Sequence, residues 1–481
     1  MKKTKLSLRL PQEFSPRALW VVLITFALIV TVMGGGSRSD IASIPLLRAI
    51  AVAFAFLAIV MMPTGAVRAI RVPLLLLAAL AFWMVLQLVP LPVGIWSALP
   101  ERELIHSIDV LLGHPNRWRP LSLTPSLTLN SLMSLVVPAA ALLIVAGIPN
   151  RDRHRLWWLL WAFALASSGL ALLQFMAGPR SPLYLYRITN EGSLVGLFAN
   201  RNHQAFLLSF GILASSWLLV KEMARKVRRP LVTAALGGSI ILFLILILVT
   251  GSRLGLMCGC IALVVGYLVI CWGFRIRYRR LNVVPSEKAV RSDTIARYAL
   301  VVFPVLIVSV TGALIYASGR ASSITRLLEG GDNVSEVRLA ALGTVLAQLR
   351  EQWLFGSGFG SFAKLFQLAE PDELLQPSYL NHAHNDWLQF PLEGGLPATL
   401  VAIAAIVWVG SSLFALLRQR WAGDGVGLIE AIILVTSFAF LAIGSLVDYP
   451  LRQPSIMMFA MFLIAIAVKG RADGSGWRKR N

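Results

Sequence analysis

The sequence predicts an all-α integral membrane protein with about twelve transmembrane helices and one large loop on the outer side of the membrane. Hydrophobic residues make up 57% of the 481 residues and charged residues only 14%, a balance typical of integral membrane proteins. The apolar residues also fall into runs of about 17–25, the length that an α-helix needs to cross a bilayer.

The apolar runs place the spans in order along the chain. The first follows Lys2, Lys3 and Lys5 and has no convincing cleavage site, so we expect an uncleaved anchor and not a signal peptide. The expected spans lie near 18–34, 41–62, 72–90, 129–148, 156–177, 203–220, 231–250, 254–273, 298–317, 396–417, 427–446 and 454–469.

The net charge of +21 indicates membrane orientation and not nucleic-acid binding. Most of the 44 lysines and arginines lie in the two terminal segments and in every second connection between apolar runs. Because basic segments stay on the cytoplasmic side, both termini are predicted to be cytoplasmic. The three cysteines share one apolar run and are interpreted as packing residues, with neither a metal set nor a disulfide framework.

The predicted division is a bundle of about nine helices over 1–317, a large loop on the outer side of the membrane over 318–395, and three helices with a basic tail over 396–481. The loop lacks the apolar content of a separate domain, so we expect it to lie on the bundle as a lid. An amphipathic helix is predicted from Ser335, its N-cap, to about Gln352.

Three glycines, Gly356, Gly358 and Gly360, follow this predicted helix. The spacing superficially suggests a phosphate loop, but no βαβ context surrounds it. We therefore interpret the segment as a flexible turn carrying aromatic contacts.

The stretch 381–395 ends the loop and is the strongest candidate for a reaction centre. It gathers His382, His384, Asp386 and Glu393 directly before an apolar run, where ionisable groups are costly to keep. Other polar residues are predicted at the same depth, at the outer ends of other spans. These are Asn200, Arg201, Asn202, His203, Ser252, Arg253, Arg338, Asn385, Asp448, Tyr449 and Arg452.

The residue types suggest roles. His384 has the unperturbed pKa of a general base near neutral pH, although a helix-capping role is also open. Arg253 and Arg338 suit a diphosphate, although a boundary arginine can also pair with lipid phosphate. A metal held by His382 and His384 with Asp386 or Asp448 would match no familiar zinc or iron spacing, so no metal or other cofactor is expected.

These residues resemble the O-antigen ligase and polymerase superfamily of bacterial membrane glycosyltransferases. That family carries His, then Asn, Ser or Gln, nine residues, Gly, two residues, Gly and Thr; here His384-Asn385 is followed by nine residues and then by Gly395. Ala398 stands where the second glycine is usual. The turn at Ser252-Arg253, Arg338 before the Gly-rich loop, and the phrase 198–203 are also similar to the family, over about 195–450.

The resemblance implies a GT-C-like fold and an inverting, metal-independent transfer in the bacterial inner membrane. The implied donor is a glycan on undecaprenyl diphosphate at the periplasmic face, and the acceptor is lipid A-core or a growing glycan. His384 would deprotonate the acceptor while Arg253 and Arg338 hold the leaving diphosphate. Substrate-positioning candidates are Asn200, Arg201, His203, His382, Asn385, Asp386, Glu393, Asp448 and Arg452.

Other function classes remain open at the level of sequence. Within the superfamily, a ligase is slightly favoured over a polymerase of O-antigen, capsule or exopolysaccharide repeats. A secondary transporter would also have about twelve spans, but no matching half-repeats are present and the polar residues gather at the outer surface. An inactive assembly partner would not need Arg253, Arg338 and His384 together.

Overall fold

The computed structural model describes residues 15–225, 227, 229–281, 339–375, 380–421 and 425–478. The structure is 75% helical, and the strands in the described part are the two-residue β1 (Pro90–Leu91) and β2 (Arg119–Pro120), which pair antiparallel. The predicted all-α class is therefore confirmed.

The described residues contain ten helical stretches long and apolar enough to cross a membrane, and α19 adds a shorter apolar stretch, Pro454–Gly470. They fall on the predicted spans in the predicted order, and the predicted span 298–317 lies outside the described residues. The long helices are α1 (Pro16–Met33), α2 (Ser43–Met61), α3 (Val67–Leu88), α6 (Pro125–Ser134) continued by α7 (Val136–Gly147), α8 (Arg155–Ala177), α9 (Arg201–Met223), α10 (Pro230–Thr250), α11 (Arg253–Leu281), α17 (Asp386–Trp421), α18 (Val426–Val447) and α19 (Pro454–Arg478).

Short helices occupy the connections. They are α4 (Val93–Trp96), α5 (Glu103–Leu111), α15 (Leu342–Gln352), α16 (Phe362–Ala369) and the 3₁₀ turns η1 (Asn150–Asp152), η2 (Asp372–Leu374) and η3 (Pro450–Arg452). The predicted loop helix ends at Gln352 as expected, while its predicted start at Ser335 lies outside the described residues.

Two predicted helices differ in detail from the structure. The predicted span 129–148 is divided between α6 and α7 at Leu135, because Pro138 lacks an N–H and its ring clashes with the carbonyl of Ser134. The helix predicted to start near Leu396 begins ten residues earlier at Asp386 and is kinked at Gly395, where φ is 64°. Most of the stretch 381–395 is therefore helical and not loop.

Helix α9 forms the centre of the bundle, because every residue of its most apolar stretch is buried inside the protein. It runs beside α11 in the same direction, since Gly255 lies against Ala205 near one end and Gly273 against Val220 near the other. Small residues allow this close approach of two helices inside a bilayer. The pairing brings the N-termini of α9 and α11 to the same end of the bundle.

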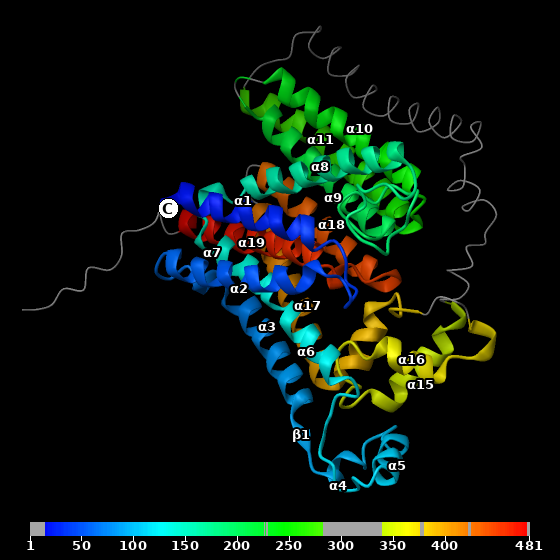
Figure 1. The fold of residues 1–481 in the computed structure, drawn as a ribbon. Coiled ribbons are helices and arrows are strands. Elements are labelled where there is room, and N and C mark those ends of the chain that lie inside the picture. The colour runs from blue at the N-terminus through cyan, green and yellow to red at the C-terminus, as the bar shows by residue number, and fades with distance from the viewer. Residues whose placement is uncertain are drawn as a thin grey trace, which may run out of the picture.

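The described part of the predicted large loop packs beside that end (Figure 1). Helices α15 and α16 bury Val345, Phe362 and Phe366 against Leu392 in the first segment of α17. The connection between α3 and α6, which carries α4 and α5, joins them through a hydrogen bond from Gln352 Nε2 to Glu101 Oε2 of 2.9 Å. The loop region therefore rests on the stretch that contains the candidate site.

Candidate functional site

The centre of the candidate site is a contact between His384 and Asp448, which lie before α17 and after α18. Nδ1 of His384 is 3.1 Å from Oδ1 of Asp448, and the Asp448 side chain is almost completely buried. A carboxylate accepts hydrogen bonds only, so Nδ1 carries the proton that it donates. This tautomer places the lone pair of the neutral ring on Nε2, as a general base requires.

The backbone holds the His384 ring in an unusual position. His384 has a φ of 49°, one of three positive values at non-glycine residues in the described chain. Such a left-handed conformation costs free energy in a residue with a side chain and is often found at functional sites. The next residue, Asn385, accepts a hydrogen bond from Leu388 N through its Oδ1 at 3.3 Å and so caps α17.

Asp448 is held from a second side by the start of α9. Asn202 Nδ2 donates to Oδ2 of Asp448 at 3.0 Å, and Tyr449 N donates to Oδ1 at 3.0 Å. Nε2 of His203 lies 3.9 Å from the same Oδ2. The sequence predicts Asp448 as a substrate-positioning residue; in the structure its Oδ1 lies within hydrogen-bond distance of His384 Nδ1.

The three histidines of the site lie around the ring of Tyr449. The ring centroids of His382, His384 and His203 lie 4.1, 4.9 and 5.3 Å from that of Tyr449. The sequence places Tyr449 next to Asp448 in the same outer turn, and nothing else in the sequence connects it with the site.

Both ring nitrogens of His382 have hydrogen-bond contacts within the protein. Its Nδ1 accepts from Gln389 Nε2 at 3.2 Å, and its Nε2 lies 3.3 Å from Ser37 Oγ. Burial, followed by the charges of Arg452 and His384, holds the pKa of His382 well below its ordinary value. Ser37 lies between α1 and α2, and nothing in the sequence connected it with the site.

Three predicted substrate-positioning residues pair with one another. Arg452 Nε donates to Asp386 Oδ1 at 2.7 Å, and its guanidinium donates to Glu393 Oε2 at 3.0 Å. Burial opposes the charged guanidinium, but the two carboxylates outweigh it and raise the pKa of Arg452 above its ordinary value. Glu393 also accepts from Gln389 Nε2 at 2.9 Å and from Phe362 N at 3.3 Å. These contacts join η3 to α17.

The Gly-rich segment packs closely against the first part of α17. Gly356, Gly358 and Gly360 all have positive φ, and the N–H groups of Ser357 and Gly358 donate to the carbonyls of Leu392 and Glu393 at 3.0 and 2.9 Å. These amides bind protein backbone, so the segment has no phosphate-binding arrangement. It is also mostly buried, which corrects the expectation of a flexible turn.

The surroundings of Gly395 explain why the residue eleven positions after His384 is a glycine. A Cβ atom at Gly395 would lie 2.5 Å from Phe355 C and 2.6 Å from Gly356 N. Backbone therefore meets backbone at this point, and φ is also positive. Ala398, the departure from the family pattern, is fully buried against Met84 and Phe359 and fits its place.

Arg201 and Arg253 lie at the N-termini of α9 and α11, which stand side by side. Asn200 caps α9 by accepting from Asn202 N at 2.9 Å, and Ser252 caps α11 by accepting from Gly255 N at 3.0 Å. Adjacent helix N-termini with two guanidinium groups form a favourable setting for an anion. Arg338, the other predicted diphosphate ligand, lies outside the described residues.

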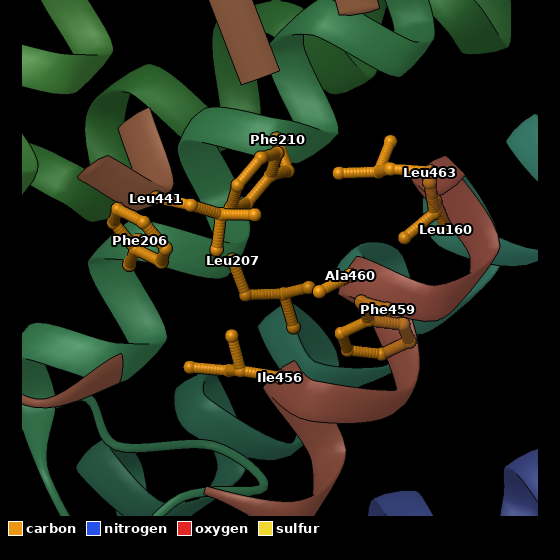
Figure 2. Close-up of a pocket in the computed structure, with 9 residues that line it drawn as sticks. All are labelled: Leu160, Phe206, Leu207, Phe210, Leu441, Ile456, Phe459, Ala460 and Leu463. Atoms are coloured by element: carbon orange, nitrogen blue, oxygen red, sulfur yellow. The ribbon is translucent and has the colours of Figure 1, made fainter. Parts of the chain in front are cut away.

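The interior of the bundle contains a small apolar cavity beside α9. Figure 2 shows apolar side chains, among them Phe206, Leu441 and Ile456, around a cavity of about 10 Å³ between α8, α9, α18 and α19. That space suffices for about one water molecule. Among the described residues, no group of three or more His, Cys, Asp or Glu side chains could hold a metal ion.

Comparison with known families gives one match. Residues 238–403 match the family model described as O-antigen ligase. The matched range includes Arg253, His382, His384 and Gly395, and ends before Asp448 and Arg452. A search of curated proteins found no significant match. The family match confirms the resemblance to the O-antigen ligase and polymerase superfamily that the His384 stretch indicated.

Proposed function

We propose that this protein, which resembles the O-antigen ligase and polymerase superfamily, transfers a glycan from undecaprenyl diphosphate to a hydroxyl group of lipid A-core, at the periplasmic face of the bacterial inner membrane. The observation that carries the proposal is the contact of 3.1 Å between His384 Nδ1 and the buried carboxylate of Asp448. It gives the one histidine of the family pattern the tautomer of a general base, at the end of the bundle where α9 and α11 begin.

In the proposed reaction, Nε2 of His384 takes the proton of the acceptor hydroxyl. The oxygen forms a bond to the anomeric carbon from the face opposite the diphosphate, and the bond between that carbon and the diphosphate oxygen breaks. Undecaprenyl diphosphate leaves with the electron pair, and the configuration is inverted. Asp448 stabilises the imidazolium that forms, as a buried carboxylate does in other acid–base pairs.

The leaving diphosphate gains negative charge as the bond breaks. Arg253 and the first turn of α11 are proposed to stabilise that charge, with Arg201 and the first turn of α9 beside them. The same role is proposed for Arg338. No metal enters this proposal, because guanidinium groups and helix N-termini supply the positive charge.

The experiment is complementation of a deletion strain with wild type, His384→Ala or the control His114→Ala. His114 lies in an exposed connection far along the chain from the site. Surface glycans and extracted lipid-linked intermediates are compared on gels. His384→Ala is expected to abolish transfer at normal protein levels, while His114→Ala retains it.

The accumulated intermediate identifies the type of transfer. Long glycans that persist on undecaprenyl diphosphate and never reach lipid A-core support the ligase. Single repeat units that accumulate instead would show a polymerase and contradict the proposed acceptor. If neither pool changes, the glycosyltransferase proposal is wrong, and solute counterflow in proteoliposomes would test transport.

A further inference from the structure

We propose that a polar cavity at the opposite end of the bundle binds a phosphate group, either of an anionic phospholipid or free in solution. The cavity has a volume of about 150 Å³, roughly ten times the space that one water molecule needs. Its lining includes Trp217 and Lys221 on α9, which lie about 20–30 Å along that helix from Asn202 at a rise of ~1.5 Å per residue. The pocket is therefore separate from the His384 site.

The cavity has an excess of positive charge. Arg153, Lys221 and Arg420 line it, and Glu430 is the one carboxylate among its described lining residues. Arg153 forms an ion pair of 2.8 Å with Glu430. Within the described part of the chain, Arg420 donates only to the neutral carbonyl of Gly470, at 3.0 Å. Among the described residues Lys221 has no ion pair, and its Nζ lies 5.9 Å from the ring of Trp217. Two cations thus remain for an anion.

Two residues that line the cavity carry buried donors without an acceptor among the described residues. Nε1 of Trp217 and Nε of Arg420 are buried and have no hydrogen-bond acceptor among the described residues. The Trp217 side chain is only 2% exposed, so bulk water does not satisfy its indole N–H. Buried donors normally have partners, and two such donors beside one cavity indicate an acceptor-rich ligand.

The start of α18 completes the site. Val426 and Gly427, the first residues of this 22-residue helix, line the cavity. A helix N-terminus carries partial positive charge and favours anions. An indole N–H, a guanidinium, an ammonium and a helix N-terminus approach from three elements, α9, α17 and α18. A phosphate group offers oxygens in several directions and suits this arrangement better than a planar carboxylate.

The test uses the purified full-length protein in a neutral detergent. Its thermal unfolding midpoint is measured against inorganic phosphate, and against mixed micelles that contain phosphatidylglycerol or, as the uncharged control, phosphatidylcholine. A saturable rise with phosphatidylglycerol alone identifies a lipid headgroup, and a rise with inorganic phosphate identifies a free-phosphate site. The proposal is overturned if neither raises the midpoint or if phosphatidylcholine has the same effect.

Substitutions of residues that line the cavity test whether the phosphate group binds there. Lys221→Gln combined with Arg420→Gln is expected to weaken binding at least tenfold, and Trp217→Phe, which removes only the N–H, several-fold. The matched control is Arg151→Gln, because the Arg151 side chain is 80% exposed and does not line the cavity. Equal binding by Trp217→Phe, the double variant and wild type would overturn the proposal. Glycan transfer is not part of the readout, so the result is independent of the proposed reaction.

Discussion

At the level of single side chains, the proposed reaction depends on the contact between His384 and Asp448. Asp448→Asn keeps the shape of the side chain but removes the charge that would stabilise the imidazolium in that reaction and favour a proton on Nδ1 of the neutral ring. We expect the rate constant for transfer to fall by roughly 10²–10⁴-fold with little change in KM. The measurement is steady-state transfer by the purified protein.

A double variant provides the control for that prediction. If Asp448 acts through His384, then His384→Ala combined with Asp448→Asn should be no slower than His384→Ala alone. Losses that multiply would show that the two residues work independently. Asn202→Ala, which removes one hydrogen bond to Asp448, should have a smaller effect in the same direction.

His382 predicts a pH dependence of stability. Its pKa in the folded protein lies well below the ordinary value of 6.5, so below that pH the unfolded chain binds the extra proton. The contribution to stability is present above about pH 6.5 and is lost as the pH falls below it. Between pH 7 and 5, the thermal unfolding midpoint of wild type should decrease more than that of His382→Asn. Parallel decreases would contradict the assignment.

Arg452 is expected to matter mainly for folding. Arg452→Met would leave Asp386 and Glu393 facing each other in a buried place, and breaking a buried ion group in this way costs about 3–5 kcal/mol. Arg151→Ala removes an exposed arginine and should cost less than about 1 kcal/mol. Unfolding by denaturant in detergent measures both. Wild-type stability of Arg452→Met with lost transfer would instead indicate a direct contact with substrate.

At the level of elements, α17 is shaped by the Gly-rich segment beneath it. Gly395→Ala places a methyl group against backbone atoms of Phe355 and Gly356 and forces a side-chain-bearing residue to a φ of 64°. We expect a loss of at least ~1–3 kcal/mol in the free energy of unfolding. The matched control in the same helix is Gly410→Ala, where a Cβ meets nothing within 4 Å and stability should be nearly unchanged. Equal effects at both glycines would show that the close approach is unimportant.

The pairing of α9 with α11 has a similar basis. Gly255, Gly259, Gly266 and Gly273 lie along one side of α11 and face α9. Small residues at intervals of four and seven permit contact over several helical turns. This contact keeps Arg253 beside Arg201, and both beside the Asn202 that holds Asp448.

At the level of the whole molecule, the contacts separate two ends of the bundle. Gln87 at the end of α3 contacts the Glu393 carbonyl, and Asn202 at the start of α9 contacts Asp448, so these helix ends share the His384 side. Val227 follows the other end of α9. With the native cysteines replaced, Arg117→Cys, after α3, should react with a membrane-impermeant thiol reagent from outside whole spheroplasts. Val227→Cys should react only after lysis, and reaction of both before lysis would contradict the topology.

The amino-acid sequence was sufficient for the fold class, the order of the described spans and the resemblance to the O-antigen ligase family. Apolar runs of membrane length need no tertiary information, because the bilayer demands them from each helix separately. The spacing from His384 to Gly395 identified the candidate base for a similar reason: the residues are close in sequence. The helix start at Asp386 was not predicted, because Gly394, Gly395 and two prolines are residue types that usually indicate a loop. The packing of the Gly-rich segment against this stretch outweighs their low helix propensity.

Tertiary structure alone decided which polar residues act together. Asp448 joins His384, whereas Arg452 joins Asp386 and Glu393, although Asp448 and Arg452 are four residues apart in one outer turn. Ser37, Gln389 and Trp217 acquire their importance only from neighbours distant in the chain. The physical reason is that hydrogen bonds and ion pairs depend on distances of about 3 Å, which are set by the packing of whole helices.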